Sequence, residues 1–462
     1  MNLMRKKNKL IFIILISLSI LLGHIVLTNY NYPFISLDGH WQLPCLSCIQ
    51  ETPFKALFYT HGASPFLGMI HILALEIGNG NPDSFYSIFL PVLHVLSFIF
   101  FLLAIERFRF KYTFLITSIL FLNPLLFSYF RYPFYSTYLF TLSSFLLFSL
   151  FSNFSSNTRF FLLSVCLSVA SFIRPSWHIS VILLLILWGA WNLRKKIQRK
   201  ILLAGIATFL LPFCLYIKNY FLFDSFSGST WLGMNIARSY TRHWIPNHVT
   251  SVPAFSSLDK YKGLYNESDP LIQKYSSEPC LNGDDFQNVR YIIIAKNYKD
   301  AVVPKISTKR IIDVLNFGFQ QFFHTPGDYF MLAPFFQRIP YPWNIYPNTD
   351  FFSLTISKYR EISFYKVVYP LLVILLLLSF KNQPWRFKLL SSLLFFLIIT
   401  NVLIDPFESN RMRIEIEPIW YFLILFYLFR FNRIFRNKIN RIQEAFGKVF
   451  ILFTYLFITR FW

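Results

Sequence analysis

Ionisable side chains beside long apolar stretches are the residues of this chain best placed to do chemistry, because charge near hydrocarbon is costly and tends to be functional. Asp38 lies about ten residues after the apolar stretch 10–28. A carboxylate in that place can act as a general base on an incoming hydroxyl group. Asp38 also precedes Gly39, and an isolated Asp-Gly pair is a turn signal, so both interpretations stay open.

Two cations follow at the ends of later apolar stretches. Arg174 stands between the stretches 159–173 and 177–193, and Lys218 lies near the end of the stretch 201–221. A guanidinium suits an anionic phosphate, because its planar fork offers paired donors. Arg174 could equally extend its charged head to the membrane surface without binding a ligand.

The segment 405–418, between two further apolar stretches, is dense in charge. Its Arg411 and Arg413 could bind a phosphate group. Neutralisation by neighbouring carboxylates is the competing explanation, and the segment offers three, Glu408, Glu415 and Glu417.

Apolar stretches recur along the chain and must position these residues. The stretch 10–28 is long enough to cross a hydrocarbon layer of about 30 Å as a helix. Only 14% of the residues are charged, below the roughly 25% of soluble domains. The sequence therefore predicts an all-α polytopic membrane protein with ten helices, or eleven if 449–459 also crosses, at 10–28, 86–105, 113–130, 137–151, 159–173, 177–193, 201–221, 366–380, 389–404 and 417–431.

The basic residues indicate the orientation of these helices. Segments predicted on one side carry 22 Lys and Arg, whereas the short loops on the other side carry 5. This asymmetry follows the positive-inside rule and predicts a cytoplasmic N-terminus. The net charge of +22 is thus mostly topological, and we expect no nucleic-acid partner.

Two segments are predicted on the extracytoplasmic side. The loop 29–85 contains apolar residues at helical spacing, interrupted by Gly62 and Pro65, which predicts one or two amphipathic surface helices. The segment 222–365 is more polar, with loops at 245–288 and 325–350 and helices at 289–302 and 305–324. We therefore divide the chain into an N-terminal transmembrane module (1–221), this extracytoplasmic segment (222–365) and C-terminal transmembrane helices (366–462).

Three of the five cysteines lie on the predicted outer side. Cys45 and Cys48 form a C-x-x-C pair, and Cys280 is the other one. A zinc site needs four ligands, and no second pair or paired histidines lie nearby in the sequence. The pattern favours a local disulfide or free thiols.

Taken in order, the outer motifs resemble those of the GT-C superfamily of polytopic glycosyltransferases, which includes the protein O-mannosyltransferase and lipid A aminoarabinose transferase groups. Asp38 matches an acidic residue of the first outer loop, and residues 59–66, with His61, resemble a segment of its surface helix. Arg174 with Pro175 resembles an Arg-Pro at a helix end. Lys218 with its neighbours, continued by 229–235, and the segment 408–418 resemble two later motifs, with Lys218 in place of the usual Arg.

The resemblance implies a glycosyltransferase with a polyprenyl-phosphate sugar donor and a lipid, glycan or protein acceptor. Asp38 would be the general base of an inverting transfer on the extracytoplasmic face. Arg174, Lys218, Arg411 and Arg413 would hold the donor phosphate, with Arg131 a more distant candidate. The resemblance assigns substrate binding to three residues, His61, Asn235 and Glu408. No cofactor is expected, because Asp38 lacks the adjacent acidic residue of many members of the superfamily; a divalent metal stays open as the alternative.

Other functions remain open at this point. A transporter or flippase of lipid-linked sugars usually has repeated halves and broken midplane helices, which this sequence lacks. A polymerase or ligase of lipid-linked glycans also carries a large outer loop, and a non-catalytic scaffold is a third alternative. The chain ends without an ER retention signal, which favours a bacterial inner membrane.

Overall fold

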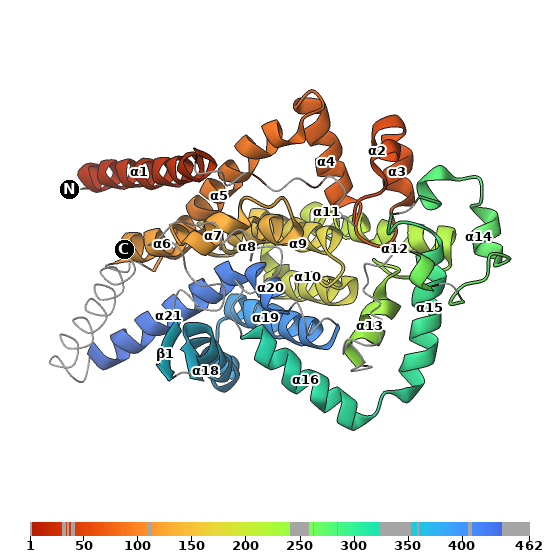
Figure 1. Cartoon of the computed structure of the whole chain (residues 1–462). Coiled ribbons are helices and arrows are strands. Elements are labelled where there is room, and N and C mark those ends of the chain that lie inside the picture. Colours follow the sequence, from red (N-terminus) through yellow and green to blue (C-terminus); the bar gives the residue numbers. More distant parts are fainter. Residues whose placement is uncertain are drawn as a thin grey trace.

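The computed structural model describes residues 2–29, 34, 37, 42–108, 112–240, 258–261, 263–283, 285–323, 353–357, 360–404 and 409–436. These residues form helices joined by irregular connections, with one antiparallel hairpin of strands β1 (Ser353–Ser357) and β2 (Arg360–Ser363). Helices therefore build this part of the molecule, as predicted (Figure 1).

The helices follow the predicted apolar stretches and outer segments in chain order. In the first half they are α1 (Asn2–Asn29), α2 (Leu46–Glu51), α3 (Pro53–Tyr59), α4 (Phe66–Ile77), α5 (Pro82–Glu106), α6 (Thr113–Phe121), α7 (Pro124–Tyr129), α8 (Tyr135–Phe151), α9 (Ser156–Ile173), α10 (Ile179–Leu193), α11 (Arg199–Ala207) and α12 (Leu210–Phe223). The later ones are α13 (Leu232–Tyr240), α14 (Pro270–Lys274), α15 (Arg290–Val302), α16 (Thr308–Phe322), α18 (Phe364–Ser379), α19 (Trp385–Ile404), α20 (Ser409–Ile414) and α21 (Glu417–Arg436).

Five helical segments of the described chain are long and apolar enough to cross a membrane: Lys9–Asn29, Pro82–Glu106, Ser156–Ile173, Arg199–Phe223 and Trp385–Ile404. They coincide with five of the ten predicted spans. The remaining predicted spans correspond to α8, α10, α18 and α21, whose described apolar parts are shorter, and to the pair α6 and α7. A helical membrane protein is supported, whereas the total of ten or eleven spans stays a prediction, and 449–459 lies outside the described residues.

The span predicted at 113–130 is not one helix. It is divided into α6 and α7 at Leu122 and Asn123. Pro124 explains the break, because a proline inside a helix lacks the N–H donor and clashes with the preceding turn, whereas it is favoured at the first helical position. The backbone carbonyl of Asn123 accepts from the Leu126 N–H at 3.0 Å and so begins α7.

Two of the basic segments predicted to be cytoplasmic lie together. Lys9 of α1 forms an ion pair with Glu106 at the end of α5. Arg107 donates from Nη1 to the carbonyl oxygen of Phe151, the last residue of α8, at 2.9 Å. Figure 1 shows the start of α1 at one end of the molecule and α14 and α15 at the opposite end.

The predicted surface helices of the first outer loop form as α3 and α4, preceded by the short α2. The chain leaves the helical conformation between Tyr59 and Phe66, the interval that contains Gly62 and Pro65. Met69, Leu73 and Ile77 follow one another at intervals of four residues along α4 and are exposed. This apolar stripe agrees with the amphipathic character predicted from the sequence.

The outer segment contains α13 and α15, which pack closely. A Cβ atom on Gly233 of α13 would lie 1.9 Å from the backbone carbonyl oxygen of Ala295 in α15. No side-chain rotation can relieve a contact with backbone, so glycine allows this approach of the two helices. The helices predicted at 289–302 and 305–324 are confirmed as α15 and α16 over their described residues.

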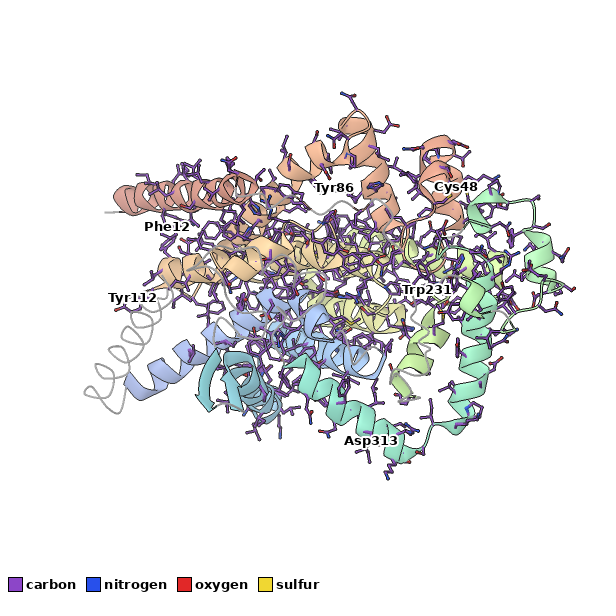
Figure 2. All side chains as sticks on the ribbon, viewed as in Figure 1. Phe12, Cys48, Tyr86, Tyr112, Trp231 and Asp313 are labelled. Carbon is purple, nitrogen blue, oxygen red and sulfur yellow. A yellow bond between two sulfur atoms is a disulfide. The ribbon has the colours of Figure 1, made fainter. Side chains whose placement is uncertain are left out.

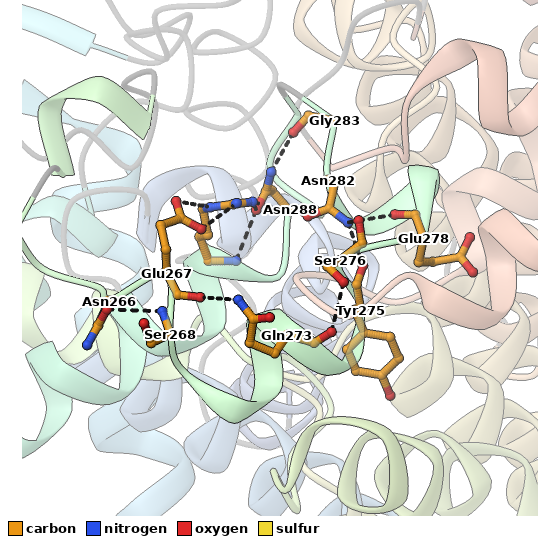
Figure 3. A network of polar contacts seen from close by, with 11 residues as sticks. Asn266, Glu267, Ser268, Gln273, Tyr275, Ser276, Glu278, Asn282, Gly283 and Asn288 are labelled. Carbon is orange, nitrogen blue, oxygen red and sulfur yellow. Dashed lines mark hydrogen bonds and ion pairs between the residues drawn. The ribbon is translucent and has the colours of Figure 1, made fainter.

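Side-chain hydrogen bonds hold the described chain that precedes α15 (Figure 3). Arg290 forms a two-pronged ion pair with Glu267, with Nε and Nη2 at 2.9 and 2.7 Å from the two carboxylate oxygens. Asn288 donates from Nδ2 to the carbonyl of Gly283 at 2.7 Å, and Asn282 donates to the carbonyl of Glu278 at 3.0 Å. The described residues of the predicted loop segment 245–288 are therefore ordered by polar contacts.

A disulfide between Cys48 of α2 and Cys280 of the outer segment corrects the prediction of a local bond or free thiols. The two Cα atoms are 5.7 Å apart, a normal separation for a disulfide, although 232 residues separate them in sequence. Cys45 keeps a free thiol. Figure 2 shows Cys48 and Trp231 toward one end of the molecule and Phe12 toward the other.

Candidate functional site

The turn at residues 60–64, between α3 and α4, contacts the ends of two apolar helices. Its Thr60 carbonyl accepts a hydrogen bond from the Lys218 ammonium of α12. Its Ser64 hydroxyl donates to the carbonyl of Phe172 in the last turn of α9. The 60–64 turn therefore lies between the ends of α9 and α12.

The loop that leads into α13 binds the same turn. The Ser229 hydroxyl donates to the Gly62 carbonyl at 2.6 Å, and the Thr230 N–H donates to the His61 carbonyl at 3.0 Å. A Cβ atom on Gly62 would lie 2.5 Å from Nε1 of Trp231, so the absent side chain admits the indole ring. Three of the motifs singled out in the sequence thus meet at one place: the segment 59–66, the helix end before Arg174 and Pro175, and Lys218 with the continuation 229–235.

His61 is fully buried and uses both ring nitrogens inside the protein. Nε2 lies 2.7 Å from the carbonyl oxygen of Gln287, which can only accept, so Nε2 carries the proton. Nδ1 then accepts from the Thr230 hydroxyl at 2.7 Å. Burial lowers the pKa of His61 to about 3, which keeps the ring neutral. These hydrogen bonds give His61 a structural role in holding the turn to Thr230 and Gln287. Its predicted role in binding sugar stays a prediction.

Gln287, a buried residue that the sequence analysis did not single out, joins the outer segment to the first outer loop. Its side-chain oxygen accepts from the N–H groups of His61 and Gly62, both at 2.9 Å. Its Nε2 donates to the carbonyl of Gln42 at 3.0 Å. The Gln287 side chain therefore fixes the 60–64 turn at His61 and Gly62. Gln287 belongs to no recognisable motif, so no sequence signal could have identified it.

Arg174 forms a buried ion pair with Glu415, with side chains 9% and 1% exposed. Trp177 lies with Nε1 3.4 Å from the second carboxylate oxygen of Glu415. The Glu415 backbone carbonyl accepts from the Ser143 hydroxyl of α8 at 2.7 Å. These contacts join the 174–177 turn to the turn between α20 and α21.

Arg413 is also buried and paired. Its Nε donates to Glu417 at 3.0 Å, and its Nη1 donates to the carbonyl of Phe322 at the end of α16 at 2.6 Å. The Tyr369 hydroxyl of α18 donates to the other oxygen of Glu417. The neutralisation considered for the 405–418 segment is thus present for Arg413.

The other predicted site residues are only partly described. Asn235 lies on α13 and is half-buried. Asp38 and Glu408 lie outside the described residues, and Arg411 begins the last turn of α20 with a side chain that is not described. Their predicted roles are therefore untested.

Arg131, the fifth cation considered, is buried beside the end of α1. Its Nη1 donates to the carbonyl of His24, and its Nη2 donates to the Thr28 hydroxyl, both at 2.9 Å. The guanidinium carbon lies 4.1 Å from the centre of the Phe34 ring. Phe34 and Leu37 are the two described residues between the end of α1 and Asp38, and both are buried.

A metal ion has no evident place among the described side chains. No group of three or more His, Cys, Asp or Glu that could hold one occurs in the part of the chain that the structure describes. At the helix ends around the 60–64 turn and Glu415, the described side chains offer the half-buried Lys218, the two carboxylate-bound arginines Arg174 and Arg413, and hydroxyl and amide groups.

No family model, curated protein or solved structure matches this chain.

The pair of Arg174 and Glu415 should show strong coupling. Replacing either one with Met leaves the other charge buried without its partner, so each single variant should lose about 3–5 kcal/mol of unfolding free energy. The double variant should lose clearly less than the sum of both. Equilibrium unfolding in detergent micelles measures the unfolding free energy of the wild type, both single variants and the double variant. Additive losses would show that the two side chains are not coupled.

His61 should make the protein sensitive to acid. The unfolded ring takes up a proton near pH 6.5, whereas the folded ring does so near pH 3. Stability should therefore fall as the pH drops through this window, by up to about 1.4 kcal/mol per pH unit from this residue. A His61→Gln variant, followed by thermal unfolding at several pH values, should show a shallower dependence than the wild type; an unchanged slope would contradict this assignment.

Proposed function

We propose that this protein is a membrane glycosyltransferase that moves a sugar from a polyprenyl-phosphate donor to an acceptor hydroxyl on the extracytoplasmic face. One observation carries the proposal. Residues from four sequence motifs far apart in the chain are joined by contacts at the ends of the apolar helices, through the 60–64 turn and through Glu415. Such clustering is the expected arrangement for a site built from loops on a helical scaffold.

Lys218 is the best candidate for the donor phosphate. Its half-buried ammonium bonds to a backbone carbonyl, and no ion pair of Lys218 with a carboxylate occurs among the described residues. Arg174 and Arg413 differ, because each is already paired with a buried glutamate. A phosphate group would compensate the poorly solvated ammonium, whereas at either arginine it would compete with a carboxylate.

The disulfide supports an extracytoplasmic position for the same region. Disulfides persist mainly in oxidising compartments such as the bacterial periplasm or the ER lumen. Cys48 lies in the first outer loop and Cys280 in the outer segment, and Gln287, seven residues after Cys280, binds the 60–64 turn. The 60–64 turn is thus held by the same segment that carries the disulfide, and the disulfide favours an extracytoplasmic position for both.

The chemistry proposed is an inverting substitution. Asp38 removes the proton of the acceptor hydroxyl, which attacks the anomeric carbon from the side opposite the phosphate. The polyprenyl phosphate then leaves with its charge held by Lys218. Charge stabilisation of a leaving phosphate by a fixed cation is typically the larger contribution, and a general base adds about 10²–10⁴-fold.

Asp38→Asn should reduce sugar transfer by about 10²–10⁴-fold, because the amide cannot accept the proton. The assay incubates membranes with a radiolabelled polyprenyl-phosphate sugar and separates products from donor, which also distinguishes transfer from transport. Asp224→Asn is a matched control, since Asp224 is exposed in the left-handed conformation that Asn tolerates. Near-normal transfer by Asp38→Asn would remove Asp38 from the mechanism.

Lys218→Met should remove the leaving-group cation and lower the rate of transfer by about 10²–10³-fold. Lys218→Arg keeps the charge and should retain much more activity. Thermal unfolding of both purified variants in detergent separates a loss of chemistry from a loss of the bond to Thr60. Equal activity of the Met and Arg variants would assign Lys218 a packing role only.

A further inference from the structure

Three cysteines gather where the first outer loop meets the outer segment. Cys48 is bonded to Cys280, and Cys45 stands three residues before Cys48. A Cβ atom on Gly283 would lie 3.7 Å from Cβ of Cys45, so Cys45 also lies against the loop that follows Cys280. Cys45 therefore lies beside Cys48 and against the loop that follows Cys280.

Cys48 has two possible partners within bonding reach. Cys45 is the N-cap residue of α2, and its Sγ accepts from the Cys48 N–H at 3.4 Å. Residues three apart at the start of a helix have Cα atoms roughly 5–6 Å apart, within the range that a disulfide spans. The distance to Cys280, 5.7 Å between Cα atoms, is of the same size. A Cys45–Cys48 bond therefore needs no large movement of the backbone.

Exposure differs between the three sulfur-bearing residues. Cys48 and Cys280 are 5% and 3% exposed, whereas Cys45 is partly exposed. A thiol in solution has little access to the existing disulfide. It would have access to a bond that includes Cys45.

We propose that these residues form a thiol–disulfide exchange site, in which Cys45 opens the bond between Cys48 and Cys280. The Cys45 thiolate attacks Sγ of Cys48, a Cys45–Cys48 bond forms, and Cys280 leaves as a thiolate that takes up a proton from water. One disulfide replaces another, so the step is redox-neutral and needs no outside oxidant or reductant. The new bond presents Cys45 to external thiols, which can then reduce it.

Exchange would uncouple two parts of the outer face. With Cys280 released, the disulfide no longer cross-links α2 to the outer segment. The ion pair of Lys55 with Glu278, at 2.8 Å, and the hydrogen bonds of Gln287 remain. The inference does not depend on the proposed sugar transfer, since it concerns the bonding of the sulfur atoms alone.

The test maps disulfides in the full-length protein in its membranes. Samples are equilibrated in glutathione buffers from oxidising to reducing, the free thiols are trapped with N-ethylmaleimide, and the peptides are analysed by mass spectrometry. The wild type should yield a disulfide-linked Cys45–Cys48 peptide in buffers of intermediate glutathione redox potential. The Cys280→Ser variant should yield the same peptide under oxidising conditions. Absence of that peptide from the wild type at every buffer would overturn the proposal.

The rate of reduction gives a second test that leaves the Cys48–Cys280 bond in place. Cys45→Ser should slow the opening of this bond by glutathione, because the route through the exposed Cys45 is lost. Cys214→Ser is the matched control, since Cys214 is an exposed free cysteine on α12. In this variant the Cys48–Cys280 bond should open at the wild-type rate. Equal rates in Cys45→Ser and the wild type would show that Cys45 takes no part.

Discussion

The hydrogen bonds of the 60–64 turn are the interactions on which the described outer face depends. A buried polar group without a partner costs about 1–3 kcal/mol, so a turn enclosed between apolar helices has to find donors for its carbonyl groups. Three successive carbonyls of this turn accept from α12 and from the loop before α13. Satisfying one short turn therefore fixes the place of α12 and of the approach to α13 relative to α9.

Two buried ion pairs fix the neighbouring region in another way. Arg174 and Glu415 are 241 residues apart in sequence, and each would be strongly destabilising alone in the interior. A buried pair adds little net stability over apolar residues but is costly to break, so it specifies one geometry rather than a stronger fold. An arginine held in this way has little uncompensated charge to offer a ligand. Arg174 and Arg413 therefore position helix ends, which is why the proposal assigns the donor phosphate to Lys218, whose ammonium bonds to a backbone carbonyl.

Apolar length predicted the long helices because crossing hydrocarbon requires about 20 residues of one character. The same rule failed at 113–130, where Pro124 imposes a break that hydropathy does not register. The resemblance assigned residues of the outer motifs to one site, but it did not indicate the groups that join them. Gln287 and the partner of Cys48 lie far away in sequence, and only the folded chain brings them into contact. Asp38 lies outside the described residues, so its role rests on the resemblance.

The first outer loop is bound on two sides, and the bonds on these sides differ in kind. Toward the apolar helices it is held by hydrogen bonds of the 60–64 turn, which open only if the local fold opens. Toward the outer segment it is held by Gln287 and by the disulfide of Cys48 with Cys280. Of these contacts, the disulfide is the one that a thiol outside the protein can break. A redox change would therefore loosen the outer segment while the helix ends around Lys218 keep their arrangement.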